Sequence, residues 1–459
     1  MDKKSILWAI VVLIISVVII FYKFNQIPAD LTRDEVEFTR LALSLSGEPY
    51  APYSPLATGH STLYFYLILD SFKLFGVTSF ALRLPSALFG ILSPVVFYAI
   101  IKQIFPKKFS ILSANWRTHI SIPLALLLVF LLVTQRWYFN FARFSFEVTF
   151  LLFLELVSLW FLLIYFKSKN YKYALGSGVF AGLAYNSYIV GRLFFVLPLI
   201  FFIYEILNRG SSDLIGVQDD KKKKRLHLLI FKGLLAFLLP FILLTSPLNL
   251  YLTQNKDIRI HQQSYFNNTE LNFQTKMQFL GQNLASIPLM LFVPDKGDVT
   301  GLHNYPYKPA LNPIIGVLFL SGLCISISRF FQHRGLEIRT RKRYIAFFFV
   351  WFMFSLIPTI LTYPWENPNM LRTYTSLVPI IFFSGITIDY AYQLVQRKKL
   401  STYFGIILIG LVCVSAWYEL RTYYVFQTEV FKEAFEIKDQ LRGVEAEYIR
   451  KLDSESSSE

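Results

Sequence analysis

The sequence predicts an all-α polytopic membrane protein with a bundle of about eleven transmembrane helices, and with thirteen as the upper alternative. Of its 459 residues, 54% are hydrophobic and only 16% are charged, whereas a soluble domain carries about 25% charged residues. Several separate segments reach the roughly 20 apolar residues that cross a bilayer. The net charge is +15, and the basic residues form short clusters between these segments. This pattern is typical of cytoplasmic loops beside anionic lipids and not of a nucleic-acid-binding surface.

Eleven apolar segments are predicted to cross the membrane. The first follows Lys3 and Lys4 and resembles a signal peptide without a small-residue cleavage site, which indicates a retained signal-anchor helix. The segments are Ile6–Phe21, Leu84–Phe105, His119–Tyr138, Val148–Phe166, Tyr173–Tyr188, Leu193–Leu207, Leu228–Leu250, Leu311–Arg329, Tyr344–Leu361, Thr375–Leu394 and Thr402–Trp417.

The charges of the connecting loops predict their sides of the membrane. With a cytoplasmic N-terminus, five loops fall inside and all five are basic, as the positive-inside rule requires. This register needs Leu63–Val77 to lie in the interface as a helix, and Met277–Val293 is assigned in the same way. If both segments crossed, there would be thirteen spans. We therefore expect a multi-pass plasma (inner) membrane protein whose active site lies on the external side.

Residues 1–419 are expected to form one transmembrane domain, with a long first external loop at about residues 22–83 that carries interfacial helices. Residues 420–459 are expected to form a short external helical tail, and its end, "DSESSSE", is expected to be disordered. No internal repeat stands out.

The first external loop contains the charged stretch "LTRDEVEFTR". Asp34 and Glu35 are adjacent, so on a helix their side chains point about 100° apart and do not act as one pair. Thr32 stands three residues before Glu35, which is the spacing of a capping box. A helix-capping role is therefore the alternative to a catalytic one, above all for Glu35.

Six further motifs follow this acidic pair along the chain. They are "GHSTLYFYLI", "ALRLPSALFGIL", "FARFSFE", "YIVGRLFF", "HNYPYKPALNPIIGVLFLSGL" and "ENPNMLRTYTSLVPI". Together they resemble the GT-C superfamily of membrane glycosyltransferases, in particular the protein O-mannosyltransferases and the bacterial aminoarabinose transferases of the glycosyltransferase family 39 type. Ser61 and Thr62 stand where this family usually has a proline.

The resemblance implies transfer of a sugar from a polyprenyl-phosphate donor to a hydroxyl of a lipid, glycan or protein acceptor, with inversion expected. Such a reaction needs a carboxylate to take the hydroxyl proton and cations or donors beside the leaving phosphate. Asp34 is the expected base, or a ligand of a divalent metal ion, which is the one cofactor expected. Glu35 is its expected partner, and Glu147 is expected to hold the acceptor or a metal.

Other residues are expected to bind phosphate or substrate. Arg143 is predicted to share a helical face with Glu147, four residues later. Each arginine has an alternative role in an interfacial ion pair or in reaching lipid headgroups, and Tyr64 has one in the aromatic belt of the membrane interface. The predicted binding residues are Arg143, Arg192, Arg372, His60, Tyr64, His303 and Asn304.

Two other classes of function compete with this interpretation. A transporter or flippase of lipid-linked sugars would place ionisable residues near the midplane, often between inverted repeats. Here the polar candidates gather on one predicted face, and Glu155, in the middle of a span, is the unexplained exception. The other alternative is a non-catalytic assembly subunit with a transferase fold.

Overall fold

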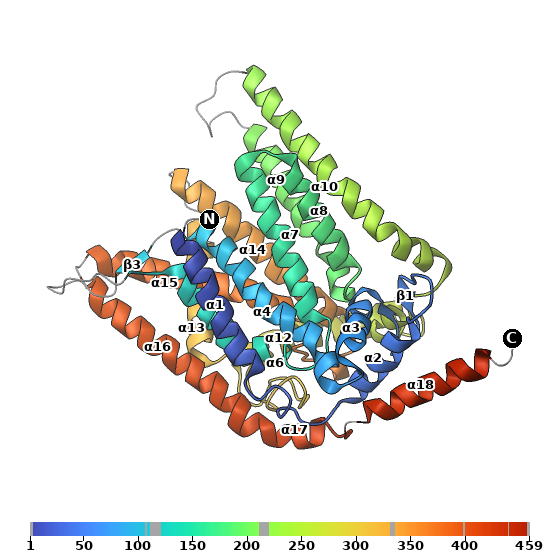
Figure 1. The fold of residues 1–459 in the computed structure, drawn as a ribbon. Coiled ribbons are helices and arrows are strands. Elements are labelled where there is room, and N and C mark those ends of the chain that lie inside the picture. Colours follow the sequence, from blue (N-terminus) through green and yellow to red (C-terminus); the bar gives the residue numbers. More distant parts are fainter. Residues whose placement is uncertain are drawn as a thin grey trace.

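The computed structural model describes residues 3–105, 108–110, 121–210, 220–330, 336–397, 400–438 and 440–456, and it is almost entirely helical (Figure 1). The helices at the predicted spans are α1 (Lys3–Phe21), α4 (Ser79–Ile104), α5 (Leu124–Thr134), α7 (Val148–Ser168), α8 (Tyr171–Tyr185), α9 (Val196–Gly210), α10 (Asp220–Gln254), α13 (Pro313–Phe330), α14 (Leu336–Leu361), α15 (Leu377–Arg397) and α16 (Ser401–Arg421). The other helices are α2 (Arg33–Ser44), α3 (Leu63–Phe75), α6 (Arg136–Asn140), α11 (Ile258–Gln263), α12 (Phe273–Phe292), α17 (Thr428–Ala434) and α18 (Leu441–Ser456).

Two short antiparallel strand pairs and four 3-10 helices, η1 (Ile189–Leu193), η3 (Tyr265–Asn267), η4 (Pro364–Glu366) and η5 (Tyr374–Ser376), accompany the α-helices of the described structure. One strand pair joins β1 (Tyr53–Ser54) to β2 (His60–Ser61), and the other joins β3 (Lys108–Ser110) to β4 (Ser121–Pro123). The predicted helical membrane fold is confirmed.

The exact number of spans stays a prediction. In the described part of the chain, 7 helices are long and apolar enough to cross a membrane. Three more apolar helices have only 10–17 residues, among them α5. At a rise of 1.5 Å per residue α5 extends about 16 Å, roughly half of a bilayer core. It ends because Gln135 has an extended backbone (ψ 127°), after which the chain turns into the short α6.

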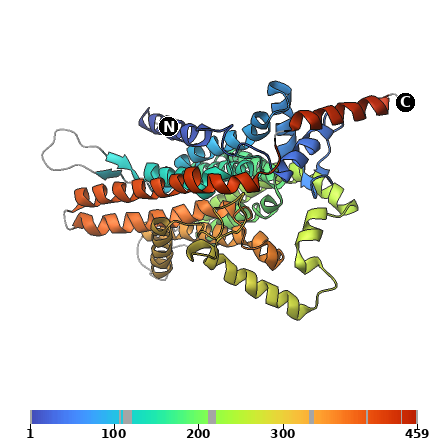
Figure 2. The same ribbon diagram turned by 90° about the horizontal axis from the view of Figure 1, so that it is seen from below.

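Small residues allow the helices of the bundle to pack closely. A Cβ on Gly178 of α8 would lie 2.0 Å from the carbonyl oxygen of Phe237 in α10, so only glycine fits there. Close backbone approach through small residues is a common way for helices to associate in membranes. On its other side α8 packs against α7, which in turn packs against α4, while α13 packs against α15. Helices α15 and α16 run side by side (Figure 2).

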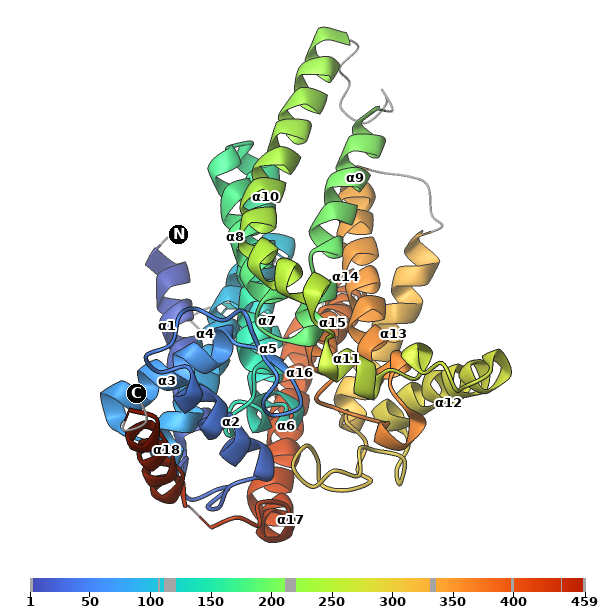
Figure 3. The ribbon, with the colours of Figure 1, turned by 90° about the vertical axis from the view of Figure 1, so that its right-hand side faces the viewer.

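The short helices gather at one end of the bundle. Helices α2, α3, α11 and α17 lie there, and α12 extends sideways from it, across the direction of α10 and α14 (Figure 3). The N-terminal ends of α1, α10 and α14 lie toward the opposite end. The interfacial positions of α3 and α12 stay predictions. Which end faces the cytoplasm also stays a prediction.

The C-terminal segment is attached to the first external loop. Helix α16 continues through a π-helical turn (Thr422–Gln427) into α17. Leu31 and Ile437 then form an antiparallel bridge, with N–O distances of 2.8 and 3.1 Å. Helix α18 packs against α2 (Figure 1). It ends at Ser456 and so includes the first residues of the segment "DSESSSE", which was predicted to be disordered. Residues 457–459 lie outside the described residues.

Candidate functional site

The two acids of α2 have different surroundings, and Glu35 is fully engaged in structure. The hydroxyl of Thr32 accepts a hydrogen bond from the backbone N of Glu35 (3.0 Å), and the Glu35 carboxylate accepts one from the backbone N of Thr32 (3.1 Å). The predicted capping box is therefore present. Glu35 Oε1 also receives Arg83 Nε at 2.7 Å and the backbone N of Ser145 at 3.1 Å. The side chain of Glu35 is 0% exposed, so the geometry favours a structural role over the predicted catalytic one.

Arg83 was not among the predicted site residues, although it lies in the segment "ALRLPSALFGIL". Its guanidinium donates to both oxygens of Glu35 and to the backbone oxygens of Pro28 and Asp30. This buried pair joins the start of α2 to α4. It thereby fixes the position of the neighbouring residue, Asp34.

Asp34 is the free carboxylate of the pair. Among the described residues its side chain has no hydrogen bond or ion pair, and it reaches solvent. Burial by the surrounding protein raises the pKa of Asp34, while the positive charge of Arg259 and those that His60 and His303 carry when protonated lower it and Glu147 raises it further. The net effect is a raised pKa. The charges that influence the pKa of Asp34 thus come from four other parts of the chain.

His60 and Glu147 form the centre of this group. His60 Nδ1 lies 2.5 Å from Glu147 Oε1, and both side chains are buried. Arg259 Nη1 lies 3.1 and 3.2 Å from the two ring nitrogens of His60. Burial opposes ionisation of Glu147, but His60 and Arg259 more than offset it and lower the pKa of this carboxyl. Glu147 Oε2 has no hydrogen-bond partner among the described residues.

Arg192 reaches the same group from the turn before α9. It forms an ion pair with Asp257, whose other oxygen accepts a hydrogen bond from the backbone N of Ile260 (3.0 Å) and so caps α11. The cavity among His60, Glu147, Arg192 and Arg259 is only about 10 Å³, roughly the minimum for one water molecule. The side chains therefore close on one another.

Two residues of this group, Asp257 and Arg259, were not predicted from the sequence. Both lie in the long loop after α10, in the stretch "NKDIRIH". Asp257 at an N-cap position was the one signal in this stretch. It predicts the start of a helix and does not predict a functional site.

Arg143 does not lie where the sequence predicted. Residues 141–147 form a turn and not a helix, so the expected pairing of Arg143 with Glu147 four residues later is wrong. The side chain of Arg143 instead points to the end of α1. There it donates to the backbone oxygens of Ile19, Ile20, Lys23 and Ile27, and to the hydroxyl of Tyr423 at 3.1 Å. Arg143 thus connects α1 with the C-terminal segment, and this geometry does not support its predicted phosphate contact.

Tyr64 and Asn304 also have structural surroundings. The Tyr64 hydroxyl lies 2.6 Å from Ser86 Oγ, and the side chain is fully buried. Asn304 accepts a hydrogen bond from Arg136 and donates to the backbone oxygens of Asp298 (3.0 Å) and Lys308 (2.7 Å). Both residues shape the protein around the site, and their predicted substrate contacts stay untested.

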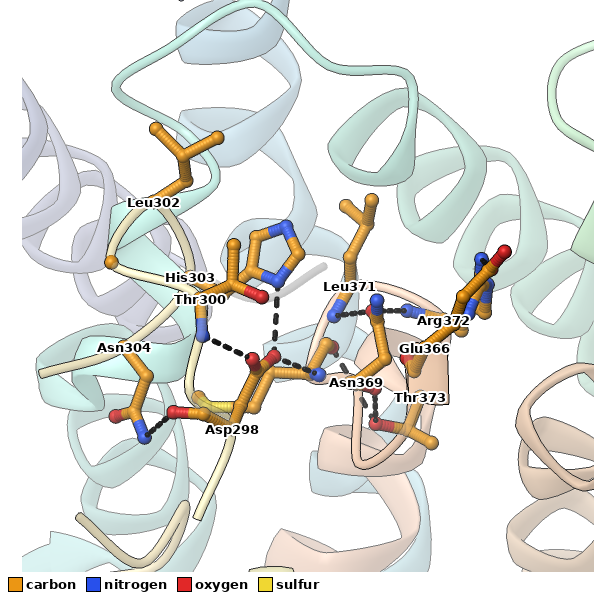
Figure 4. A network of polar contacts seen from close by, with 12 residues as sticks. Asp298, Thr300, Leu302, His303, Asn304, Glu366, Asn369, Leu371, Arg372 and Thr373 are labelled. Atoms are coloured by element: carbon orange, nitrogen blue, oxygen red, sulfur yellow. Dashed lines mark hydrogen bonds and ion pairs between the residues drawn. The ribbon is translucent and has the colours of Figure 1, made fainter. Parts of the chain in front are cut away.

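His303 and Arg372 lie in a second polar network, between the loop before α13 and the turn before α15 (Figure 4). His303 Nδ1 lies 3.0 Å from Asp298 Oδ2, which also accepts the backbone N of Met370 at 2.7 Å. Arg372 forms an ion pair with Glu366. His303, when protonated, lowers the pKa of Asp34, so the charge of this second network also influences that carboxyl.

A larger cavity of about 510 Å³ lies between the loop before α13 and α13 itself, with Tyr418 of α16 on its wall. Lys308 lines it, with Nζ at 2.9 Å from Thr422 Oγ1 and 4.2 Å from the ring centroid of Tyr418. None of the predicted site residues lines this cavity, so we do not assign it to the candidate site.

The described residues do not provide a set of ligands for a divalent metal ion. Among the described residues there is no group of three or more histidine, cysteine, aspartate or glutamate side chains placed to hold one. Arg259 also brings a fixed positive charge against His60, beside the two carboxylates that were expected to serve. The donor set does not fit, and we derive no step through a metal.

Comparison with known proteins agrees with this architecture. Residues 59–218 match the family described as dolichyl-phosphate-mannose-protein mannosyltransferase. The oligosaccharyltransferase of Archaeoglobus fulgidus in its apo form is similar in structure, with a TM-score of 0.54 at 12% identity over 91% of this chain. The chain has the GT-C fold. ArnT from Cupriavidus metallidurans, in a crystal structure with bound undecaprenyl phosphate, gives a TM-score of 0.51 at 12% identity, over 93% of this chain and 76% of ArnT.

The resemblance to the GT-C membrane glycosyltransferases of the protein mannosyltransferase type is confirmed. The chain spans 56% of the length of the archaeal oligosaccharyltransferase. No curated protein sequence matches the chain at a significant level. The matched range includes His60, Glu147 and Arg192, whereas Asp34 and Arg259 lie outside it.

Proposed function

We propose that the protein transfers a sugar from a polyprenyl-phosphate donor to a hydroxyl of a lipid, glycan or protein acceptor at the external membrane face. The observation that carries the proposal is a pair of buried arginine Nε donors without acceptors in the described part of the chain, near a free carboxylate. The cavity they line is about 10 Å³, so a phosphate would bind there only after these side chains moved apart. Arg192 Nε and Arg259 Nε are buried and have no hydrogen-bond partner among the described residues. Both arginines line the cavity with Glu147. The positive charge of Arg259 also lowers the pKa of Asp34. Buried donors without acceptors are costly, so an anionic ligand is the natural partner.

A phosphate group suits these donors. The planar guanidinium offers paired N–H groups that match phosphate oxygens. Arg259 forms no ion pair within 4 Å among the described residues and contacts the rings of His60 and Tyr188. Its charge nevertheless lowers the pKa of Asp34 and of Glu147. Arg192 is held by Asp257 and still has its free Nε. The donor class is supported by the similar fold of ArnT, which was crystallised with undecaprenyl phosphate.

Asp34 serves as the base in this proposal. The acceptor hydroxyl gives its proton to the Asp34 carboxylate as its oxygen bonds to the anomeric carbon. The bond between that carbon and the phosphate oxygen breaks, and its electron pair leaves with the phosphate, which the arginines stabilise. Burial raises the pKa of Asp34, and a stronger base takes the proton more readily near neutral pH. Attack opposite the leaving phosphate inverts the anomeric centre.

The test is a transfer assay with purified protein in lipid nanodiscs. Radiolabelled polyprenyl-phosphate mannose and aminoarabinose serve as donors, with membrane lipids and serine- and threonine-containing peptides as acceptors. We expect label in a new glycosidic product, and we expect Asp34→Asn to abolish it. Glu37→Gln is the matched control, because Glu37 lies on the same helix and, in the described part of the chain, pairs only with the exposed Arg40. Donor that crosses the bilayer without forming a new glycosidic bond would support the transporter instead.

A further inference from the structure

The cavity beside the start of α13 has the size of a ligand-binding site. Its volume is about 510 Å³, and pockets that bind small ligands have about 300–1,000 Å³. One wall is the beginning of α13, and the other is the loop that precedes this helix. Val317 and Leu320 belong to the helix wall and are 64% and 43% exposed. Because α13 is a predicted span, these exposed apolar side chains indicate that the cavity opens toward lipid.

Lys308 brings a positive charge to this cavity. Its Nζ donates to Thr422 Oγ1 at 2.9 Å and lies 4.2 Å from the ring centroid of Tyr418, which also lines the cavity. A hydroxyl and an aromatic ring do not neutralise an ammonium group, and the described residues give Lys308 no ion pair. Burial lowers the pKa of Lys308, and the charge of Arg136 lowers it further, while that of Glu419 raises it. An anion beside this half-buried cation would stabilise it.

Glu419 does not supply that anion, because its carboxylate is already engaged. Oε2 accepts a hydrogen bond from Arg136 Nε at 3.3 Å, and Oε1 accepts one from Asn312 Nδ2 at 2.9 Å. Arg136 and Glu419 form a buried ion pair. Their charges compensate each other, which leaves the charge of Lys308 available to a ligand.

The backbone around Lys308 is fixed before any ligand binds. The carbonyl oxygen of Lys308 accepts a hydrogen bond from Asn304 Nδ2 at 2.7 Å, and that of Pro309 accepts one from Arg136 Nη2 at 3.2 Å. Since Arg136 begins α6, these contacts hold the loop against that helix. A ligand therefore binds without the cost of ordering the loop.

Asp295 brings the opposite charge to the same cavity. It lines the cavity from the segment after α12, and it is exposed. In the described part of the chain its carboxylate forms no ion pair. Tyr305 and Tyr307 also line the cavity, and an aromatic face attracts an ammonium group. The walls thus present a cation and an anion beside an apolar surface, which matches a ligand with both charges and an apolar tail.

We propose that this cavity binds a membrane phospholipid whose headgroup carries both a phosphate and a primary amine, of the phosphatidylethanolamine class. The phosphate contacts Lys308, the ammonium group contacts Asp295, and an acyl chain lies along the exposed side of α13. The sugar donor is assigned to a different place, because Arg192 and Arg259 line another cavity. The lipid site is therefore independent of the proposed function, and its tests need no transfer activity.

The first test measures lipid binding to the purified full-length protein in detergent by native mass spectrometry. Phosphatidylethanolamine and phosphatidylglycerol with identical acyl chains are compared, and phosphatidylethanolamine should bind at the lower concentration. Lys308→Gln should weaken its binding about 10-fold, because a hydrogen bond to a charged group is lost. Lys296→Gln is the matched control, because Lys296 is exposed in the same loop and is not among the described residues that line the cavity. Unchanged binding in Lys308→Gln, or equal losses in both variants, would overturn the proposal.

Asp295 provides a test of headgroup selectivity. Asparagine tolerates the positive φ of 64° at this position, so Asp295→Asn should fold normally. The variant should lose most of the preference for phosphatidylethanolamine, because the ammonium group loses its anion while phosphatidylglycerol no longer meets a repulsive charge. An undiminished preference would contradict the assigned headgroup.

Two further ligands distinguish the possible sources of the phosphate. Glycerophosphoethanolamine has the headgroup without acyl chains and should compete only weakly with the lipid. Competition as strong as that of the intact lipid would identify a soluble phosphate ester as the occupant and overturn the lipid site. Undecaprenyl phosphate should bind equally well to the wild type and to Lys308→Gln. If Lys308→Gln weakened its binding more than that of phosphatidylethanolamine, the cavity would belong to the sugar donor and the proposal would be wrong.

Discussion

His60 Nδ1 and Glu147 Oε1 lie 2.5 Å apart although 87 residues separate them in the sequence. Both side chains are nearly inaccessible, at 3% and 1% exposed. Removing one member of a buried ion pair leaves the other without compensation and costs about 3–5 kcal/mol. We therefore expect Glu147→Gln to lower the free energy of unfolding by about 3 kcal/mol, measured by chemical denaturation in detergent. Glu429→Gln removes an exposed pair with Lys432 and should cost below about 1 kcal/mol; equal losses would contradict a buried pair.

The same pair predicts how stability changes with pH. The folded protein lowers the pKa of Glu147 from its ordinary value of 4.5. A carboxyl with a lowered folded pKa stabilises the folded state above its unfolded pKa, and this contribution disappears as the pH falls through the folded pKa. The difference in stability between the protein and Glu147→Gln should therefore shrink as the pH falls below about 4.5. A difference that grew on acidification would have the wrong sign.

Asp34 and Arg259 make a prediction about the pH dependence of the reaction. Burial raises the pKa of Asp34 and Arg259 partly offsets that rise, so activity should fall as the pH drops through a value above that of an ordinary aspartate. Arg259→Gln removes the offset. We expect it to move the acidic limb of the pH profile of kcat/KM to higher pH. It should also raise the KM for the donor. Arg33→Gln, an exposed change beside Asp34, should leave the limb in place.

Glu35 and Arg83 are expected to matter for folding and not for the chemical step. Their 2.7 Å contact is buried at 0% and 2% exposure and joins α2 to α4. Glu35→Gln should therefore lower the midpoint of thermal unfolding clearly, while the folded fraction turns over at close to the normal rate. Thr32→Ala removes only the cap hydrogen bond and should cost about 1 kcal/mol. If folded Glu35→Gln protein were inactive at full stability, the catalytic role predicted from the sequence would be favoured again.

Local patterns predicted the elements that depend on neighbouring residues. The spacing of Thr32 and Glu35 predicted a capping box that is present, and the apolar segments predicted helices at each span. The same local reasoning failed for Arg143, because it assumed a helix where residues 141–147 form a turn. A four-residue spacing places two side chains on one face only if the backbone is helical.

The candidate site itself depends on contacts between distant residues. Arg259 reaches His60 across 199 residues, and Glu147 reaches the same ring across 87. No spacing rule connects such positions. Arg259 in particular lies in a long loop whose sequence suggests only the start of a short helix, so tertiary folding alone brings it to the site. Glu155 lies buried in the middle of α7, and no contact of the described residues assigns it a role.

The predicted orientation can be tested by labelling from either side of the membrane. Glu48 is exposed in the first long loop, close to the end of α2, and Lys172 is exposed near the start of α8. The basic stretch around Lys172 predicts a cytoplasmic position by the positive-inside rule. The native Cys324 and Cys413 are first replaced by alanine, since both are free and exposed. An impermeant maleimide added to intact cells should then label Glu48→Cys, and it should label Lys172→Cys only after the membrane is permeabilised. Labelling of both in intact cells would place the two loops on one side, and Asp34 would then no longer have an assured external position.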